Sequence, residues 1–252
     1  MTYHRKHDRT ESRSWFSLFL RLGGWASLIA AVGLLILTAF SAGNLYSAGA
    51  LDKDGEVALA TVADKRFEVT TDSDGDDETV YYVTFKFAAQ ARGEVTVESE
   101  VDWAYYDGVA VQDLREVRYL RSDPTLLEYE PGQFRRTGTL LRYIALGLGI
   151  VGLTLLWVFG KQANRAIRVR RDGEKRLATV TDIMDTRVEV NGNPQGRLVW
   201  READTQTGQS LMRDMYGLET LYRIGDEIVV FRLGKHAFWE GDVGPPKRKT
   251  GP

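Results

Sequence analysis

The sequence predicts a membrane protein with two transmembrane helices and two small β-barrel or sandwich-like domains, one on each side of the membrane. Three observations predict this class. Residues 22–51 contain no charged side chain, and a second uncharged run covers residues 143–159. Between them lies an acidic stretch whose apolar residues alternate as they do in β-strands. A further β pattern follows the second run, so the expected order is helix, sheet, helix, sheet.

The two uncharged runs are long enough to cross a bilayer, since a helix needs about 20 apolar residues to span the hydrocarbon. We expect the first transmembrane helix at residues 22–46, after a basic leader at residues 1–21. The second is expected at residues 139–160, where Arg142 can extend its charged head to the interface. Aromatic residues typical of membrane interfaces flank both runs: Trp15, Phe16, Phe19, Trp25, Tyr46, Tyr143, Trp157 and Phe159.

Basic residues predict the orientation, because Lys and Arg next to a span are retained on the cytoplasmic side. Basic residues occur in the leader and in the juxtamembrane segment 161–176, whereas residues 44–137 carry twenty acidic and ten basic residues. We therefore expect the segment 47–138 outside the cytoplasm and both termini inside, in an inner (plasma) membrane. The basic residues of the leader are Arg5, Lys6, Arg9, Arg13 and Arg21.

A cleavable signal peptide is the alternative for the first run, because Ala48-Gly49-Ala50 resembles a small-residue cleavage site. The long leader, and an apolar run longer than the roughly 7–15 residues of a signal core, favour a retained anchor. Cleavage would leave one anchor instead of two. The chain has no cysteine, which excludes a disulfide framework and a lipoprotein attachment.

The segment 47–138 is expected to fold as a β domain of five short strands. Tyr81, Val83 and Phe85 stand at alternate positions, as in a half-buried strand, and the acidic run 72–78 predicts a turn. Such short strands avoid open edges most easily in a small barrel or a tight sandwich. The expected strands cover residues 57–69, 80–87, 95–101, 116–120 and 126–129, with a short helix at 102–106.

A second β domain is expected at residues 177–243, followed by a disordered tail at 244–252. Residues 178–182 (Ala-Thr-Val-Thr-Asp) match residues 60–64 (Ala-Thr-Val-Ala-Asp) in four of five positions. This domain is therefore a possible repeat of the first, with chance identity between β domains as the alternative. Its expected strands cover residues 188–190, 198–200, 210–215 and 225–231, with a turn at 191–194.

Several core and turn segments of the outer domain follow a known pattern. They are Ala60-Thr61-Val62, the aromatic strand at 80–85, Val117-Arg118-Tyr119, and Ser122-Asp123-Pro124 running to Leu126-Leu127-Glu128. In these segments the chain resembles bacterial membrane proteins that carry the domain of unknown function 3592. The resemblance covers residues 55–131, and residues 176–240 more weakly. It implies a transmembrane protein with small β domains, and the family name assigns no activity.

The second apolar run contains glycines whose spacing, at 147–152, fits a dinucleotide-binding loop. That loop needs a preceding strand and an aqueous phosphate site, which a position inside a membrane span does not provide. Small residues let helices approach closely, and Ala145 with Gly149 forms a small-xxx-small pair. We expect helix pairing at these two residues, against Ala26 with Ala30 or Ser27 with Ala31 of the first helix.

No catalytic residue, metal ligand or cofactor is expected. In the acidic turn, Asp72, Asp74 and Asp76 match three ligand positions of a calcium loop, but the glycine falls at position 75 and no helices flank it. A solvated hairpin tip is therefore favoured over a weak cation site. The chain lacks cysteine and the serine and zinc motifs of hydrolases, which predicts a non-enzymatic protein. The histidines are His4, His7 and His236.

The juxtamembrane segment 161–176 carries the strongest functional pattern. Cations beside a span bind anionic lipid at about 1 kcal/mol each, and they also retain a helix end in the cytoplasm. Nucleic acid is not expected as a partner, because residues 161–252 carry seventeen basic against thirteen acidic residues. The candidate residues for lipid or partner contact are Lys161, Arg165, Arg168, Arg170, Arg171, Lys175 and Arg176.

Compact domains without recognisable catalytic groups favour a scaffold or accessory subunit whose outer domain contacts other envelope proteins. Membrane lipids and a protein partner or a second copy of the chain are the expected contacts. The alternative is a ligand-sensing transducer, in which binding to the outer domain shifts the spans and alters a cytoplasmic surface.

Overall fold

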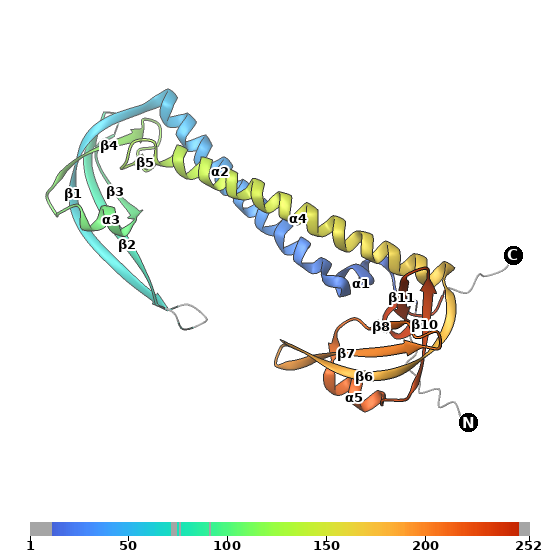
Figure 1. Ribbon diagram of the computed structural model, residues 1–252. Coiled ribbons are helices and arrows are strands. Elements are labelled where there is room, and N and C mark those ends of the chain that lie inside the picture. The colour runs from blue at the N-terminus through green and yellow to red at the C-terminus, as the bar shows by residue number, and fades with distance from the viewer. Residues whose placement is uncertain (1–11, 72–74, 76, 91, 247–252) are drawn as a thin grey trace. The chain divides into compact units, whose positions relative to one another are not determined.

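The computed structural model describes residues 12–71, 75, 77–90 and 92–246, which form two long helices and two β-sheet bodies (Figure 1). Two compact units make up the chain: Val32–Leu148, and Met1–Ala31 together with Gly149–Pro252. Helix α2 (Trp25–Asp54) leads into the first sheet, and helix α4 (Gln133–Asp172) leads into the second. The expected combination of two long apolar helices with two β-sheet bodies is confirmed.

Both long helices expose apolar side chains. In the most apolar windows of Trp15–Asp54 and Gln133–Asp172, only 17% and 6% of the residues are buried. Leu35 on α2 and Leu153 on α4 are 71% and 69% exposed. The core helix of a soluble protein would bury such residues, and both helices are long and apolar enough to cross a membrane.

The leader ends in ordered helix. Helix α1 (Trp15–Phe19) and a π-helical turn, η1 (Leu20–Gly24), precede α2, and Gly23 interrupts the helix with a φ of 107°. Phe19 is 2% exposed and packs in a protein cluster with Ala166 and Phe231. The expectation that Phe19 belongs to an interfacial belt is therefore wrong, because protein contacts cover its ring.

The first sheet is antiparallel and has the strand order β3-β2-β1-β4-β5. Helix α3 (Trp103–Asp107) lies against β2 and is capped by Asp102, whose side chain accepts a hydrogen bond from the Tyr105 N–H. The five expected strands and the short helix are confirmed. The strands are β1 (Gly55–Thr71), β2 (Asp77–Ala89), β3 (Gly93–Val101), β4 (Leu114–Leu120) and β5 (Leu127–Glu128).

This sheet is open and curved, and its edges are β3 and β5 (Figure 1). The expected small barrel or sandwich is therefore wrong for the first sheet. Aromatic rings cover its inner face instead. The ring centres of Tyr105 on α3 and Tyr129 after β5 lie 4.5 Å apart, and Tyr129 stacks on Phe85. Phe85 is fully buried beneath them.

The second sheet has the order β11-β10-β6-β7-β8, with β9 paired to β7. Its edge strands β8 and β11 approach each other, so that the sheet nearly closes into a barrel. Helix α5 (Met215–Leu221) lies against β7 (Figure 1). The strands are β6 (Glu174–Val190), β7 (Asn193–Glu202), β8 (Thr207–Gln209), β9 (Arg213–Asp214), β10 (Glu227–Leu233) and β11 (His236–Trp239).

The strand expected at residues 210–215 is shorter than predicted, and its last residue belongs to a helix. Only Arg213 and Asp214 pair as a strand, and α5 begins directly after them. Asp214 explains the change, because its carboxylate accepts a hydrogen bond from the Gly217 N–H at 2.7 Å and caps the helix. A second short helix, α6 (Glu240–Val243), ends the described fold after β11.

The two sheets share one topology. In each, the first strand lies between its hairpin partner and a later strand that follows a short helix. Both first strands carry a register shift at the same place, after Val62 in β1 and after Val180 in β6. The backbones of both valines bond to a turn before the later strand, and both side chains are fully buried.

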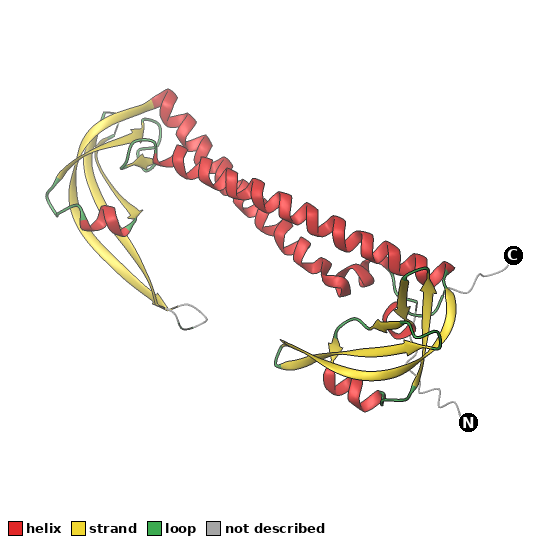
Figure 2. Ribbon diagram, in the orientation of Figure 1, coloured by secondary structure: helices red, strands yellow, loops and turns green. Residues whose placement is uncertain are grey.

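The sequence identity behind this repeat is longer than five residues. Residues 54–64 and 172–182 are identical at eight of eleven positions, beginning with Asp-Gly-Glu at the end of each long helix. The glycines, Gly55 and Gly173, permit a tight junction: a Cβ there would lie 2.2 Å and 2.3 Å from a helix carbonyl. Figure 2 shows strand following helix directly at both junctions.

Candidate functional site: a basic groove on helix α4

Helix α4 continues to Asp172, past the expected end of the span at Gly160. Ala163, Ala166 and Val169 recur at every third position after the apolar run and form one buried stripe. They pack with Val229 and Phe231 of β10. The segment 161–172 is thus helical and docked on the second sheet, and β6 begins at Glu174 rather than at residue 177.

A groove of about 790 Å³ runs beside this part of α4. Trp157, Lys161, Arg165 and Arg168 line it at spacings of three or four residues, which places them on one face of the helix. The lining is therefore apolar at one end and cationic at the other. The remaining lining residues are Leu156, Gly160, Asn164 and Val169 of α4, with Leu233 and His236 of the β10–β11 hairpin.

The three cations of the groove make no salt bridge within the described part of the chain. The Lys161 Nζ lies 4.9 Å from the centre of the Trp157 ring, in a cation–π contact. Asp172, the carboxylate nearest to Arg168 along the helix, is held by Arg171 through two hydrogen bonds of 2.8 and 2.9 Å. Among the described residues, no acidic residue lines the groove, so its lining is cationic without a paired carboxylate.

The other four candidate cations have different surroundings. Arg170 is 7% exposed and donates to the backbone carbonyls of Arg13 and Val243 at 2.7 and 2.8 Å. Arg176 pairs with acidic residues of the second sheet, and Lys175 is exposed on β6. Only Lys161, Arg165 and Arg168 of the seven candidates therefore line the groove.

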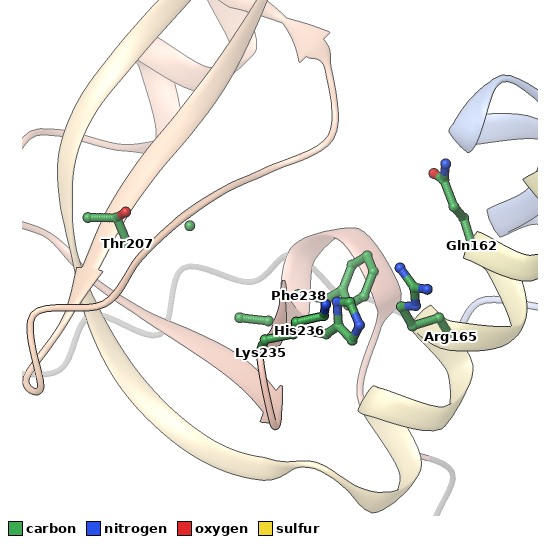
Figure 3. A pocket seen from close by; sticks show the side chains of 8 residues that line it. Gln162, Arg165, Thr207, Lys235, His236 and Phe238 are labelled. Carbon is green, nitrogen blue, oxygen red and sulfur yellow. The ribbon is translucent and has the colours of Figure 1, made fainter.

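His236 joins the groove to a smaller pocket of about 270 Å³, which Arg165 also lines. Figure 3 shows Arg165 on α4 opposite His236 and Phe238 of β11, with Thr207 at the far side. Burial lowers the pKa of the His236 imidazole, and the positive charges of Arg165 and Lys235 lower it further. The ring is therefore neutral near pH 7, and the charge of the site comes from Lys and Arg.

A buried polar cluster lies on another side of the same unit. Asp242 of α6 is 1% exposed and accepts hydrogen bonds from the Leu211 N–H at 2.8 Å and from Arg213 Nε at 3.3 Å. Burial raises the pKa of Asp242 to about 6, although Arg213 and the Leu211 N–H oppose the rise. Arg13 donates to the Gly241 carbonyl at 3.1 Å. The cluster ties the leader to α6.

The first unit carries a patch of partly exposed aromatic residues, which we call the aromatic patch. Around Tyr81, ring centres lie 6.5 Å away for Phe67, 5.2 Å for Trp103 and 4.9 Å for Tyr106. Phe67 and Trp103 are 59% and 56% exposed. The patch borders the packed core, because Tyr81 and Tyr106 pack against it, and Tyr81 lies on the same face of the sheet as Val83.

The two residues expected to pair the helices differ in burial. Ala145 is buried and Gly149 is half-buried. A small-residue contact lies at Gly152, where a Cβ would be 3.2 Å from the Ala30 Cβ. In the other unit, Ser41 donates a hydrogen bond to the Gly138 carbonyl at 2.7 Å. Sequence reasoning missed these contacts, although the glycines themselves signal close approach.

Several expectations fall on residues that the structure does not describe. Asp72, Asp74 and Asp76 of the acidic turn, His4 and His7, and the leader residues Arg5, Lys6 and Arg9 lie outside the described residues. Within residues 12–71, 75, 77–90 and 92–246, no three His, Asp or Glu side chains are grouped so as to hold a metal ion.

No protein-family model, no curated protein and no solved structure matches the chain. The resemblance to proteins with the domain of unknown function 3592 therefore stays a prediction, and function must be argued from the geometry.

Proposed function

We propose that the chain is a non-enzymatic scaffold or accessory subunit of the bacterial inner membrane. Helices α2 and α4 cross the bilayer, the first sheet lies outside, and both termini lie in the cytoplasm. The aromatic patch is the observation that supports contact with a partner. Exposed aromatic clusters of this kind are enriched at protein interfaces, where they supply most of the binding free energy.

The charge of the outer segment favours a protein as the partner. Residues 44–137 carry twenty acidic and ten basic residues, a formal charge of −10, so an anionic bilayer surface repels them. A protein surface with apolar pockets and a basic rim fits an aromatic patch in an acidic domain. Lys65 adds one cation to the patch itself, 4.2 Å from the centre of the Tyr106 ring.

A retained first helix is part of this proposal. The possible cleavage site at residues 48–50 lies inside α2, where Ala48 of the site is 7% exposed and the neighbouring Leu51 is 1% exposed. Signal peptidases need an accessible, extended segment, which this packed helix does not offer. We infer that α2 stays attached as a membrane anchor.

Site-specific photocrosslinking in cells tests the proposal. A benzoylphenylalanine at Trp103 is expected to capture one discrete partner, whereas the same residue at Thr96 is not, because Thr96 is exposed on the opposite face of the sheet. A product of twice the chain's own mass would assign the patch to a second copy of the chain. Equal products at both positions, or none at either, would contradict the proposal.

The direct helix–strand junctions favour a second candidate, a ligand-sensing transducer. The Arg118 guanidinium donates to the Leu51 carbonyl at 2.6 Å, which ties β4 to the end of α2. A ligand that moves the first sheet would therefore also move a span. A ligand-dependent thermal shift of the full chain, without any crosslinked partner, would favour this candidate over the scaffold.

A further inference from the structure

The basic groove on α4 combines two surfaces that rarely occur together in a water-facing pocket. At one end, Leu156 and Trp157 are 45% and 65% exposed and continue the apolar surface of the helix. At the other end, Lys161, Arg165 and Arg168 carry three positive charges that no carboxylate of the described residues neutralises in a salt bridge. The change from apolar to cationic occurs within about one helical turn, between Trp157 and Lys161.

We propose that this groove binds the phosphate headgroup of an anionic phospholipid, with the acyl chains along Trp157 and Leu156 and the phosphate between Lys161, Arg165 and Arg168. The inference rests on α4 being a membrane span, and it does not depend on the aromatic patch or its partner. Arg165 and Arg168 supply planar guanidinium groups, which recognise phosphate oxygens through paired hydrogen bonds. Lys161 is positioned by its contact with the Trp157 ring.

The shape of the groove favours a lipid over a soluble phosphate. Its volume of about 790 Å³ exceeds what inorganic phosphate fills, and its apolar end would stay wet beside a small hydrophilic anion. A phospholipid covers both ends at once. Leu233 and His236 of the β10–β11 hairpin close the wall opposite α4, and the neutral His236 ring can donate a further hydrogen bond.

The groove also explains why the seven juxtamembrane cations are not equivalent. Arg170 and Arg176 are held by backbone carbonyls and carboxylates, and Arg171 is held by Asp172. Diffuse attraction to an anionic membrane would use every exposed cation alike. A built site uses only those in the groove, and this difference can be measured with variants of equal charge.

Native mass spectrometry of the purified full chain in detergent, titrated with phosphatidylglycerol or phosphatidylcholine, tests the proposal. The wild-type chain is expected to retain phosphatidylglycerol over phosphatidylcholine. The double variant Arg165→Gln with Arg168→Gln is expected to lose about tenfold or more of this preference, since cations near a membrane each contribute roughly fivefold. The matched control, Lys175→Gln with Arg223→Gln, removes the same charge outside the groove and leaves the Arg171–Asp172 pair intact, so it should stay within about twofold of wild type.

Two further titrations distinguish a lipid phosphate from a soluble phosphate as the ligand of the groove. Inorganic phosphate and glycerol 3-phosphate, at millimolar concentrations, are expected to leave bound phosphatidylglycerol in place. Displacement of the lipid by either anion would reassign the groove to soluble phosphates and overturn the proposal. Equal losses in the two double variants, or no preference for phosphatidylglycerol in the wild-type chain, would also overturn it, because either result indicates diffuse attraction or none.

Discussion

Glu202→Gln is expected to destabilise the second sheet by about 3–5 kcal/mol. Glu202 is 3% exposed and Arg232 is 8% exposed, and Arg232 Nε lies 2.9 and 2.7 Å from the two carboxylate oxygens. Glutamine keeps the shape of the side chain but removes its charge, so the guanidinium stays buried without a counter-ion. The loss of unfolding free energy is therefore large, because a buried charge remains without compensation, whereas the loss of an ion pair on the surface would cost little.

The reverse variant, Arg232→Met, is expected to cost roughly half as much. Arg176 Nη1 lies 3.5 Å from Glu202, and its side chain is 33% exposed, so the carboxylate keeps a solvated counter-ion. Replacing both Glu202 and Arg232 with methionine removes both buried charges. The unfolding free energy of this double variant should return to within about 1 kcal/mol of wild type or exceed it.

These differences in unfolding free energy can be measured by urea unfolding of the full chain in detergent micelles. The fluorine resonance of 5-fluorotryptophan at Trp200 reports the unfolding of the second sheet. Trp200 is fully buried in the core of the second sheet, and Trp200→Phe assigns its signal. Glu98→Gln is the control, because it removes a two-bond pair with Arg66 from the exposed surface of the other sheet. It should leave the Trp200 transition unchanged. The reasoning would be refuted if Glu202→Gln and Arg232→Met lowered the unfolding free energy equally and the double methionine variant lost the sum of the two.

Three further predictions concern the same fold. The folded chain holds a proton on Asp242 up to about pH 6, whereas the unfolded chain releases it near pH 4, so Asp242 lowers the unfolding free energy by on the order of 3 kcal/mol as the pH rises between those values. Urea titrations should show that Asp242→Asn removes this contribution, so that the stability difference between variant and wild type changes by about that amount over the range. Arg170→Met removes the hydrogen bonds from Arg170 to the carbonyls of Arg13 and Val243, so trypsin should cut after Arg13 at least about tenfold faster, and unchanged cleavage would count against the contact. Gly152→Leu should lower the unfolding free energy of the full chain by about 1–3 kcal/mol, measured by thermal unfolding, because the new side chain clashes with Ala30. Gly147→Leu is the control and should have no such effect, because nothing lies within 4 Å of a Cβ there. Equal effects of the two variants would argue against helix contact at Gly152.

Local patterns predicted the first sheet well. Tyr81, Val83 and Phe85 alternate because one face of β2 is packed, and this local signal needs no knowledge of distant residues. The end of α4 was harder to predict, because the cations around Ala163 and Ala166 hide the apolar stripe. Its buried partners on β10 lie more than sixty residues further along the chain.

The fate of each juxtamembrane cation could not be predicted from spacing alone. Arg170 is bound by a carbonyl 157 positions away in the chain and by another 73 positions away. Arg165 faces a hairpin that forms only when β10 and β11 pair. Tertiary contacts therefore divide seven similar residues into structural cations and groove cations. The repeat was within reach of sequence reasoning, since the eight identities between residues 54–64 and 172–182 need only a longer comparison.

Labelling of single cysteines tests the central claim, that both long helices cross the membrane and leave the two sheets on opposite sides. The chain has no cysteine, so Thr96→Cys in the first sheet and Ala203→Cys in the second each provide one exposed thiol. In intact spheroplasts, a membrane-impermeant maleimide should label Thr96→Cys but not Ala203→Cys, and lysis should expose both. Labelling of both thiols before lysis, or of Ala203→Cys alone, would contradict the account.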